Sequence, residues 1–123
     1  MRGITLLLAA AMLLTGCQAI KGVFEKGHKG DADLAAGVLS YEDGNYKESM
    51  RQLQSALGAG LSDTGKVRAH KHLAFIHCVS GRQGPCREEF RKALAINPKL
   101  ELEPAEAGHP LWGPVFAKEK ARR

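Results

Sequence analysis

Apolar residues recur at helical spacing through the centre of this 123-residue chain. Between Val67 and Val79 they stand at positions 69, 73, 74 and 76, which places them on one face of a helix. Pro85 suits the start of a following helix, because a proline in the first turn loses no needed N–H, and Asn97-Pro98 marks its end. No alternating strand pattern competes, so the chain is predicted to be all-α.

The helical pattern occurs twice. When Gly44 is aligned with Gly81, a shift of 37 residues, small and apolar residues coincide on both sides of the glycine. The coinciding pairs are Ala36 and Leu73, Gly37 and Ala74, Ser49 and Cys86, Leu53 and Phe90, Ala56 and Ala93, and Leu57 and Leu94. Each copy predicts a helix, a glycine-containing turn and a second helix. Together the two copies span residues 32–100.

This unit resembles the tetratricopeptide repeat (TPR), a helix–turn–helix motif of about 34 residues. The resemblance implies two TPR-like repeats, which form a short α-solenoid. Two departures are visible: Asp33 and His70 stand where TPR helices usually carry tryptophan, and extra residues fall between Gly60 and Gly65. An unrelated pair of helical hairpins is the alternative.

Residues 101–123 differ in composition, because they combine prolines and glycines with the only tryptophan. A single helical turn is predicted over Pro104–Ala107 and a short last helix from Pro114. Two repeats alone would expose an apolar end, so this segment is interpreted as a cap folded over the second repeat. The expected cap residues are Leu111, Trp112, Val115 and Phe116. A mobile hook for a partner is the rival interpretation.

The N-terminus has the pattern of an export signal. Arg2 precedes an apolar run, Ile4–Leu14, that is shorter than the roughly 20 residues of a membrane-spanning helix. Leu14-Thr15-Gly16-Cys17 resembles the lipobox of bacterial lipoproteins, so residues 1–16 are expected to be a signal peptide and Cys17 the lipidated residue. Residues 17–31 read as a tether. Gln18, where inner-membrane lipoproteins typically carry aspartate, favours the outer membrane, facing the periplasm.

The two other cysteines, Cys78 and Cys86, are expected to form a disulfide, because an exported chain meets an oxidising compartment. Removing Arg2 with the signal peptide lowers the formal charge from +5 to +4. This mild excess favours a solvated, mixed-charge surface, and no nucleic-acid partner is expected.

Candidate chemistry is sparse. A metal site could draw on five residues, namely His70, His72, His77, Cys78 and Cys86. Their spacing lacks the short pairs typical of zinc sites, and a disulfide would use both sulfurs. His109 lies between Gly108 and Pro110, which favours a role in a turn. No nucleophile, phosphate-binding or dinucleotide motif is present, so we expect neither an enzyme nor a cofactor.

The resemblance to TPR proteins also implies a concave groove lined by the first helix of each repeat. Its expected lining is Leu34, Val38, Tyr41, Arg68, Lys71 and Phe75. An apolar floor with two cations would suit a peptide that carries an acidic group or a C-terminal carboxylate. A half-buried helix face without any ligand is the alternative.

Three segments, Ala69–Cys78, Cys86–Phe90 and Pro104–Phe116, resemble TssQ-type lipoproteins associated with type VI secretion. The resemblance implies a non-enzymatic accessory of the Gram-negative envelope that acts through protein contacts. One alternative is a pilotin-like or outer-membrane assembly factor, although such TPR lipoproteins usually carry more repeats. Another is a periplasmic redox or metal-handling protein that uses the cysteines and histidines.

Overall fold

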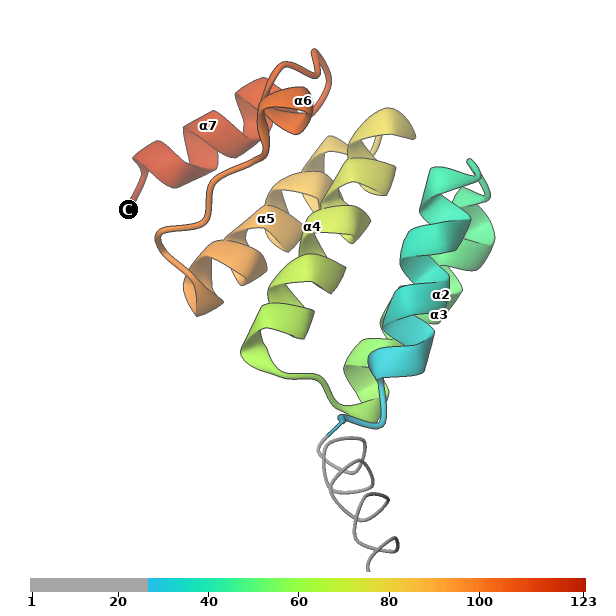
Figure 1. Ribbon diagram of the computed structural model, residues 1–123. Coiled ribbons are helices and arrows are strands. Elements are labelled where there is room, and N and C mark those ends of the chain that lie inside the picture. The colour runs from blue at the N-terminus through green and yellow to red at the C-terminus, as the bar shows by residue number, and fades with distance from the viewer. Residues whose placement is uncertain (1–26) are drawn as a thin grey trace, which may run out of the picture.

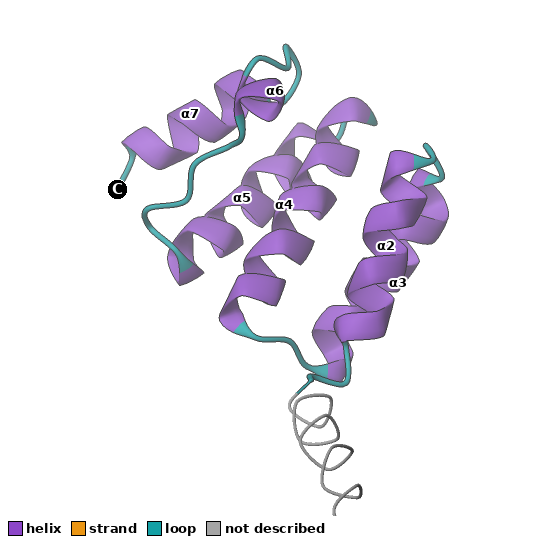
Figure 2. Ribbon diagram, in the orientation of Figure 1, coloured by secondary structure: helices purple, strands orange, loops and turns teal. Residues whose placement is uncertain are grey.

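The computed structural model describes residues 27–123, and every regular element in that range is a helix (Figures 1 and 2). The elements are α2 (Asp31–Glu42), α3 (Tyr46–Ala59), α4 (Asp63–Val79), α5 (Gln83–Ile96), α6 (Pro104–Ala107) and α7 (Gly113–Ala121). The all-α prediction is confirmed for this part of the chain. The expected signal peptide, Cys17 and most of the tether lie outside the described residues.

The helices α2 and α3 form one antiparallel hairpin, and α4 and α5 form a second beside it (Figure 1). Their turns have the same backbone geometry. Gly44 and Gly81 have φ angles of 76° and 77°, in the left-handed region that favours glycine. The N–H of the next residue donates to a carbonyl five positions back in both turns: Asn45 to Ser40, and Arg82 to His77, each at 2.8 Å.

Burial follows the same shift of 37 residues. The paired positions Ser49 and Cys86, Leu53 and Phe90, and Ala56 and Ala93 are all fully buried. Gly37 and its counterpart Ala74 also lie inside. A Cβ atom at Gly37 would lie 2.7 Å from the Leu53 side chain, so the first pair of helices approaches more closely than the second. The two hairpins are therefore alike in turn geometry and in burial.

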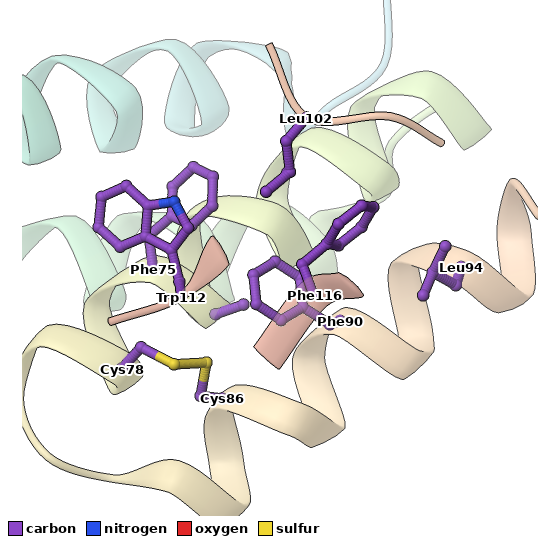
Figure 3. Packing of buried hydrophobic residues seen from close by; sticks show 9 residues of the cluster. Phe75, Cys78, Cys86, Phe90, Leu94, Leu102, Trp112 and Phe116 are labelled. Atoms are coloured by element: carbon purple, nitrogen blue, oxygen red, sulfur yellow. A yellow bond between two sulfur atoms is a disulfide. The ribbon is translucent and has the colours of Figure 1, made fainter. Parts of the chain in front are cut away.

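The interior consists of two clusters. The first lies between α2, α3 and α4 and is mostly aliphatic, and its buried members are Leu34, Val38, Leu53, Ala56, Leu61, Ala69, Leu73 and Ile76. The second lies between α4, α5 and the C-terminal segment and is rich in aromatic rings (Figure 3). In it Phe75 stacks on Trp112 with ring centroids 4.2 Å apart, and Phe90 meets Phe116 edge-on at 5.3 Å.

Cys78 and Cys86 are joined by a disulfide whose Cα atoms lie 5.2 Å apart. The bond connects the last turn of α4 to the first turn of α5, and both cysteines are buried in the aromatic cluster (Figure 3). The predicted pairing is present in the structure.

The C-terminal segment packs on the second hairpin. Trp112 is 7 % exposed and Phe116 is buried, while Val115 is half-buried. Leu111, which the sequence grouped with them, is 46 % exposed and lies outside the core. The reason is that His109 to Trp112 form a turn, so that neighbouring residues cannot all point inward. The inclusion of Leu111 was wrong.

An ion pair between a buried carboxylate on α7 and a partly exposed arginine on α5 also holds α7 in place. The Glu119 side chain is 1 % exposed and accepts a hydrogen bond of 2.8 Å from Nε of Arg91 on α5. That bond is the main cause of the lowered pKa of the Glu119 carboxyl. Among residues 27–123 no helix combines the length and apolarity that crossing a bilayer requires.

Candidate functional site

Part of the face of α4 that the sequence assigned to a partner, around Lys71 and Phe75, is covered by the chain's own C-terminal segment. Trp112 lies on Phe75, and His109 stacks on the other side of the indole at 3.4 Å between centroids. The indole Nε1 donates a hydrogen bond of 2.8 Å to the carbonyl oxygen of Glu106. These contacts occupy the place where a ligand side chain would stack on Phe75.

An ion pair continues this contact. Lys71 Nζ lies 3.0 Å from a carboxylate oxygen of Glu106, and the two side chains are only 15 % and 19 % exposed. The same carboxylate accepts the backbone N–H of Glu103 at 3.0 Å, as part of a capping box at the start of α6. Lys71 is therefore already paired, and an incoming carboxylate would compete with Glu106 for it.

Three of the six expected groove residues do not line an open groove. Leu34 and Val38 are buried in the aliphatic cluster, because α3 and α4 pack against that face of α2. Phe75 is buried beneath Trp112. The expectation of an open groove was wrong at these positions, since the second hairpin and the C-terminal segment fill the space that it required.

Tyr41 remains half-buried at the edge of this region. Its ring meets His72 edge-on, with centroids 5.1 Å apart, and it also contacts Phe75 and Tyr46. Burial, together with Tyr46 and Glu106, raises the pKa of the Tyr41 hydroxyl to about 12. The hydroxyl therefore stays neutral even in alkaline solution, so Tyr41 adds no negative charge to this region.

Arg68 and Lys71 share a pocket of about 370 Å³ between the first half of α4 and the end of α5. We call it the α4–α5 pocket. Its lining consists of Asp63, Thr64, Val67, Arg68, Lys71, Ile96, Asn97 and Leu100. Arg68 is exposed, whereas Val67, Ile96 and Leu100 are half-buried. The pocket thus offers an apolar surface beside an accessible guanidinium, which suits an apolar side chain next to a carboxylate.

The histidines considered for a metal each have a separate partner. His70 Nδ1 lies 2.6 Å from a carboxylate oxygen of Glu89, and His77 Nδ1 accepts a hydrogen bond of 2.9 Å from Arg82 Nε. His72 Nδ1 lies 2.8 Å from the carbonyl oxygen of Arg68, one turn back in α4. Within residues 27–123 no group of three or more histidine, cysteine or acidic side chains is arranged to hold a metal ion.

Two of these histidines have altered proton affinity. Burial is the largest cause of the lowered pKa of the His72 imidazole, and the charges of Lys71 and Arg68 act in the same direction. Burial and then the charge of Arg82 lower the pKa of His77. Both rings are thus held neutral, which suits packing better than an anion-binding role.

Comparison with protein-family models, with curated proteins and with solved structures found no match for this chain. The site must therefore be judged by its own geometry.

Sequence reasoning missed two acidic residues that organise the C-terminal segment, Glu106 and Glu119. Glu119 lies in a charged run that reads as solvated surface, yet it follows Trp112 and Phe116 at helical spacing and so shares their buried face. Glu106 stands three residues after Glu103, which directly precedes Pro104, and this is a capping-box spacing. Both signals are present in the sequence.

Proposed function

We propose that this chain is a lipid-anchored, TPR-like binding protein of the Gram-negative envelope, and that it holds a carboxylate-bearing segment of a partner protein in the α4–α5 pocket. The observation that carries the proposal is the position of Arg68 and Lys71 at the rim of a pocket with an apolar wall. The protein acts through contacts alone and has no chemistry of its own.

The shared geometry of the two hairpins supports TPR-like repeats. Turn hydrogen bonds and buried small residues recur with a shift of 37 residues, and TPR units likewise pack two antiparallel helices through small residues. The burial of Trp112 and Phe116 on the second hairpin supports a capping role for residues 101–123. In this proposal the cap does not bind the partner, and the pocket beside it does.

The charged side chains of the α4–α5 pocket indicate how a bound peptide would be oriented in it. Arg68 is exposed and has no carboxylate within ion-pairing distance in the described residues, whereas Lys71 is shared with Glu106. An incoming carboxylate would therefore meet Arg68 first. A neighbouring apolar side chain would then lie against Val67, Ile96 and Leu100. An acidic peptide or a free C-terminus meets both requirements.

The disulfide supports export. A buried cysteine pair closed between two helices is typical of an oxidising compartment and is rare in the cytosol. Together with the lipobox at Cys17 it favours a protein held at the outer membrane and facing the periplasm. The resemblance of Pro104–Phe116 to TssQ-type lipoproteins favours a place in type VI secretion.

The binding proposal is tested with a fluorescent library of short peptides that end in an apolar residue, prepared with a free C-terminal carboxylate and in amidated form. We expect the free-acid peptides to bind and the amidated ones to bind at least tenfold more weakly. Arg68→Glu should abolish binding of the free acids, while Lys47→Glu, an exposed charge reversal on α3, should leave it unchanged. Equal binding of both peptide forms would overturn the assignment.

The anchoring proposal is tested separately with Cys17→Ser in the full chain. We expect this change to prevent lipid attachment and retention in the outer-membrane fraction, because acyl chains supply the membrane affinity. Ser80→Cys, which adds a cysteine elsewhere, should not restore labelling with palmitate. Continued palmitate labelling of the Cys17→Ser chain would show that the lipid is attached at another residue and would overturn the assignment to Cys17.

A further inference from the structure

Within the described residues, the α4–α5 pocket has one cation that is free to bind an incoming carboxylate. Two cations line the pocket, Arg68 and Lys71, together with the carboxylate of Asp63. Lys71 Nζ lies 3.0 Å from a carboxylate oxygen of Glu106. Asp63 has a more distant partner, since its carboxylate lies 3.8 Å from Lys66 Nζ. Arg68 is exposed and forms no such pair. The pocket therefore offers a ligand one positive charge rather than two.

The charged residues of the pocket follow one another along α4. Asp63 is the first residue of the helix, Arg68 comes one turn later, and Lys71 follows after nearly another turn. Since each residue of an α-helix rises about 1.5 Å, Asp63 and Lys71 are ~12 Å apart along the helix axis. The Glu106 carboxylate lies at the Lys71 end. A ligand carboxylate bound at Arg68 would therefore have a negative charge of the protein on either side of it.

Glu106 is held in place by contacts of the C-terminal segment. Its carboxylate accepts the backbone N–H of Glu103 at 3.0 Å, within the capping box of α6. Its carbonyl oxygen accepts the indole N–H of Trp112 at 2.8 Å, and that indole stacks on Phe75. The Glu106 side chain is also largely shielded from water. Because Glu106 is fixed beside α4, Lys71 stays paired with it and is not available to a ligand.

We propose that the α4–α5 pocket selects a protein C-terminus with a single carboxylate, and that Glu106 and Asp63 exclude a second one. Arg68 binds the terminal carboxylate, while the last apolar side chain lies against the apolar wall of the pocket. An acidic residue just before the last one would place its carboxylate toward Asp63 or Glu106, where like charges repel. This inference rests on the proposed function. It narrows the ligand to a free C-terminus without neighbouring acidic residues and rules out an acidic segment.

The test compares two fluorescent peptides that differ by one charge. Both end in leucine with a free carboxylate and are otherwise uncharged, except that the residue before the leucine is glutamine in one and glutamate in the other. We call them the single-carboxylate and the double-carboxylate peptide. Binding to the full chain is measured by fluorescence anisotropy at low ionic strength, where charges are least screened. We expect the double-carboxylate peptide to bind no more tightly than the single-carboxylate peptide.

Glu106→Gln should reverse this order. Glutamine still accepts the N–H of Glu103 in a capping box, so the change removes the charge and keeps the fold. Lys71 then becomes free to bind a second carboxylate, and we expect the double-carboxylate peptide to bind at least fivefold more tightly than the single-carboxylate peptide. The ratio of the two affinities is the readout, because a loss of structure would weaken both peptides alike. Glu42→Gln, at an exposed position on α2, is the matched control and should leave the ratio unchanged.

Asp63→Asn tests the other end of the pocket. The Asp63 side chain is 84 % exposed and its contact with Lys66 is long, so the fold should depend little on this carboxylate. We expect the affinity ratio of the double-carboxylate to the single-carboxylate peptide to rise at least twofold. Combining Asp63→Asn with Glu106→Gln should raise the ratio above that of either single variant, since the two carboxylates lie on opposite sides of Arg68.

Tighter binding of the double-carboxylate peptide by the unaltered chain would overturn the inference and leave carboxylate binding at Arg68 intact. An unchanged affinity ratio in Glu106→Gln would also overturn it, and an unchanged ratio in Asp63→Asn would overturn the role of Asp63. If neither peptide binds, or if amidated peptides bind equally well, the proposed function is wrong and this inference fails with it. The two failures are therefore distinguished by whether the single-carboxylate peptide binds better than its amide.

Discussion

The two helical hairpins have the same backbone plan, yet different bonds hold their helices together. In the first, the buried hydroxyl of Ser49 donates a hydrogen bond of 2.7 Å to the carbonyl oxygen of Gly37. In the second, Cys86 takes the place of Ser49 and is bonded to Cys78. Both solutions need a small side chain where the helices approach each other. The comparison shows that both hairpins keep a small residue at this position, whereas the bond that this residue makes differs between them.

The hairpins also differ in their neighbours. The first packs on the second through aliphatic side chains, and within residues 27–123 it leaves Leu39 on the outer side of α2 exposed. The second lies between the first hairpin and the C-terminal segment, and its core contains four stacked or edge-on aromatic rings: Phe75, Phe90, Trp112 and Phe116. Stability should therefore depend more on the second hairpin.

The largest expected effect is that of Trp112→Ala. The change removes a buried indole and its hydrogen bond to Glu106, and truncation of a buried aromatic side chain costs about 3–5 kcal/mol. Domains of this size unfold with about 5–15 kcal/mol, so the variant should be close to unfolding. Urea denaturation followed by far-ultraviolet circular dichroism measures the loss, since the variant has no tryptophan to report it.

Leu111→Ala is the matched control for Trp112→Ala, because Leu111 is adjacent in sequence and exposed. It should change the free energy of unfolding by less than about 0.5 kcal/mol. Similar losses for the two variants would contradict the view that the second hairpin depends on a packed C-terminal segment.

Removing the disulfide should have the next largest effect. Replacing Cys78 and Cys86 by alanine frees a short loop in the unfolded chain, which the chain-entropy account values at about 2.5 kcal/mol. Ser49→Ala, the corresponding change in the first hairpin, removes one hydrogen bond and should cost about 1 kcal/mol. If both variants lose the same free energy of unfolding in denaturation, the disulfide stabilises the second hairpin no more than the hydrogen bond stabilises the first.

Gly37→Ala tests the closer approach of the first helix pair. The new Cβ would lie 2.7 Å from Cδ2 of Leu53, which is fully buried, and overpacking of this kind costs about 1–3 kcal/mol. Ala74 already occupies the equivalent position in the second hairpin. Combining Gly37→Ala with Leu53→Val should recover part of the loss in thermal unfolding, and a fully additive double variant would argue against a direct clash.

The smallest effect concerns pH. Burial lowers the pKa of His72 in the folded protein, so the unfolded chain, with a usual pKa near 6.5, binds more protons in mildly acidic solution. His72 therefore does not reduce the free energy of unfolding above pH 6.5. As the pH falls below 6.5, protonation of the unfolded chain lowers this free energy, at most by about 1.4 kcal/mol per pH unit. His77, whose pKa is also lowered, adds a second contribution.

Replacing His72 by glutamine should flatten the dependence of unfolding free energy on pH between about 6.5 and 5. Ala35, its counterpart in the first hairpin, is exposed, so Ala35→His should add no dependence. An unchanged profile for His72→Gln would contradict the proposed role of burial. An added slope for Ala35→His would mean that position 35 of α2 is buried in solution.

Much of the helical framework could be predicted from the chain alone. The apolar positions near Val67–Val79, the turn glycines Gly44 and Gly81, and the prolines that begin α6 and α7 all lie where local rules put them. These signals are local, since backbone preference and spacing along one helix determine them. The pairing of Cys78 with Cys86 was also predictable, because the number of cysteines left few choices.

The expected groove failed for a different reason. A helix face shows which residues are apolar but not what covers them, and Phe75 looks the same whether a ligand or Trp112 lies above it. Leu111 and Trp112 are likewise neighbours of similar apolarity, and the turn that contains them places only the indole inside. The α4–α5 pocket could not be predicted from a single helix either, because Arg68 and Leu100 come together only when α4 and α5 pack.

By itself the sequence determined the helices, their repetition with a shift of 37 residues, and the cysteine pair, because each of these depends on residues close together in the chain or on the few cysteines available. Only the tertiary structure decided which apolar faces are covered. Burial is a property of contacts between distant segments. Packing of the C-terminal segment on α4 closed one face, while among residues 27–123 Leu39 of α2 stays exposed.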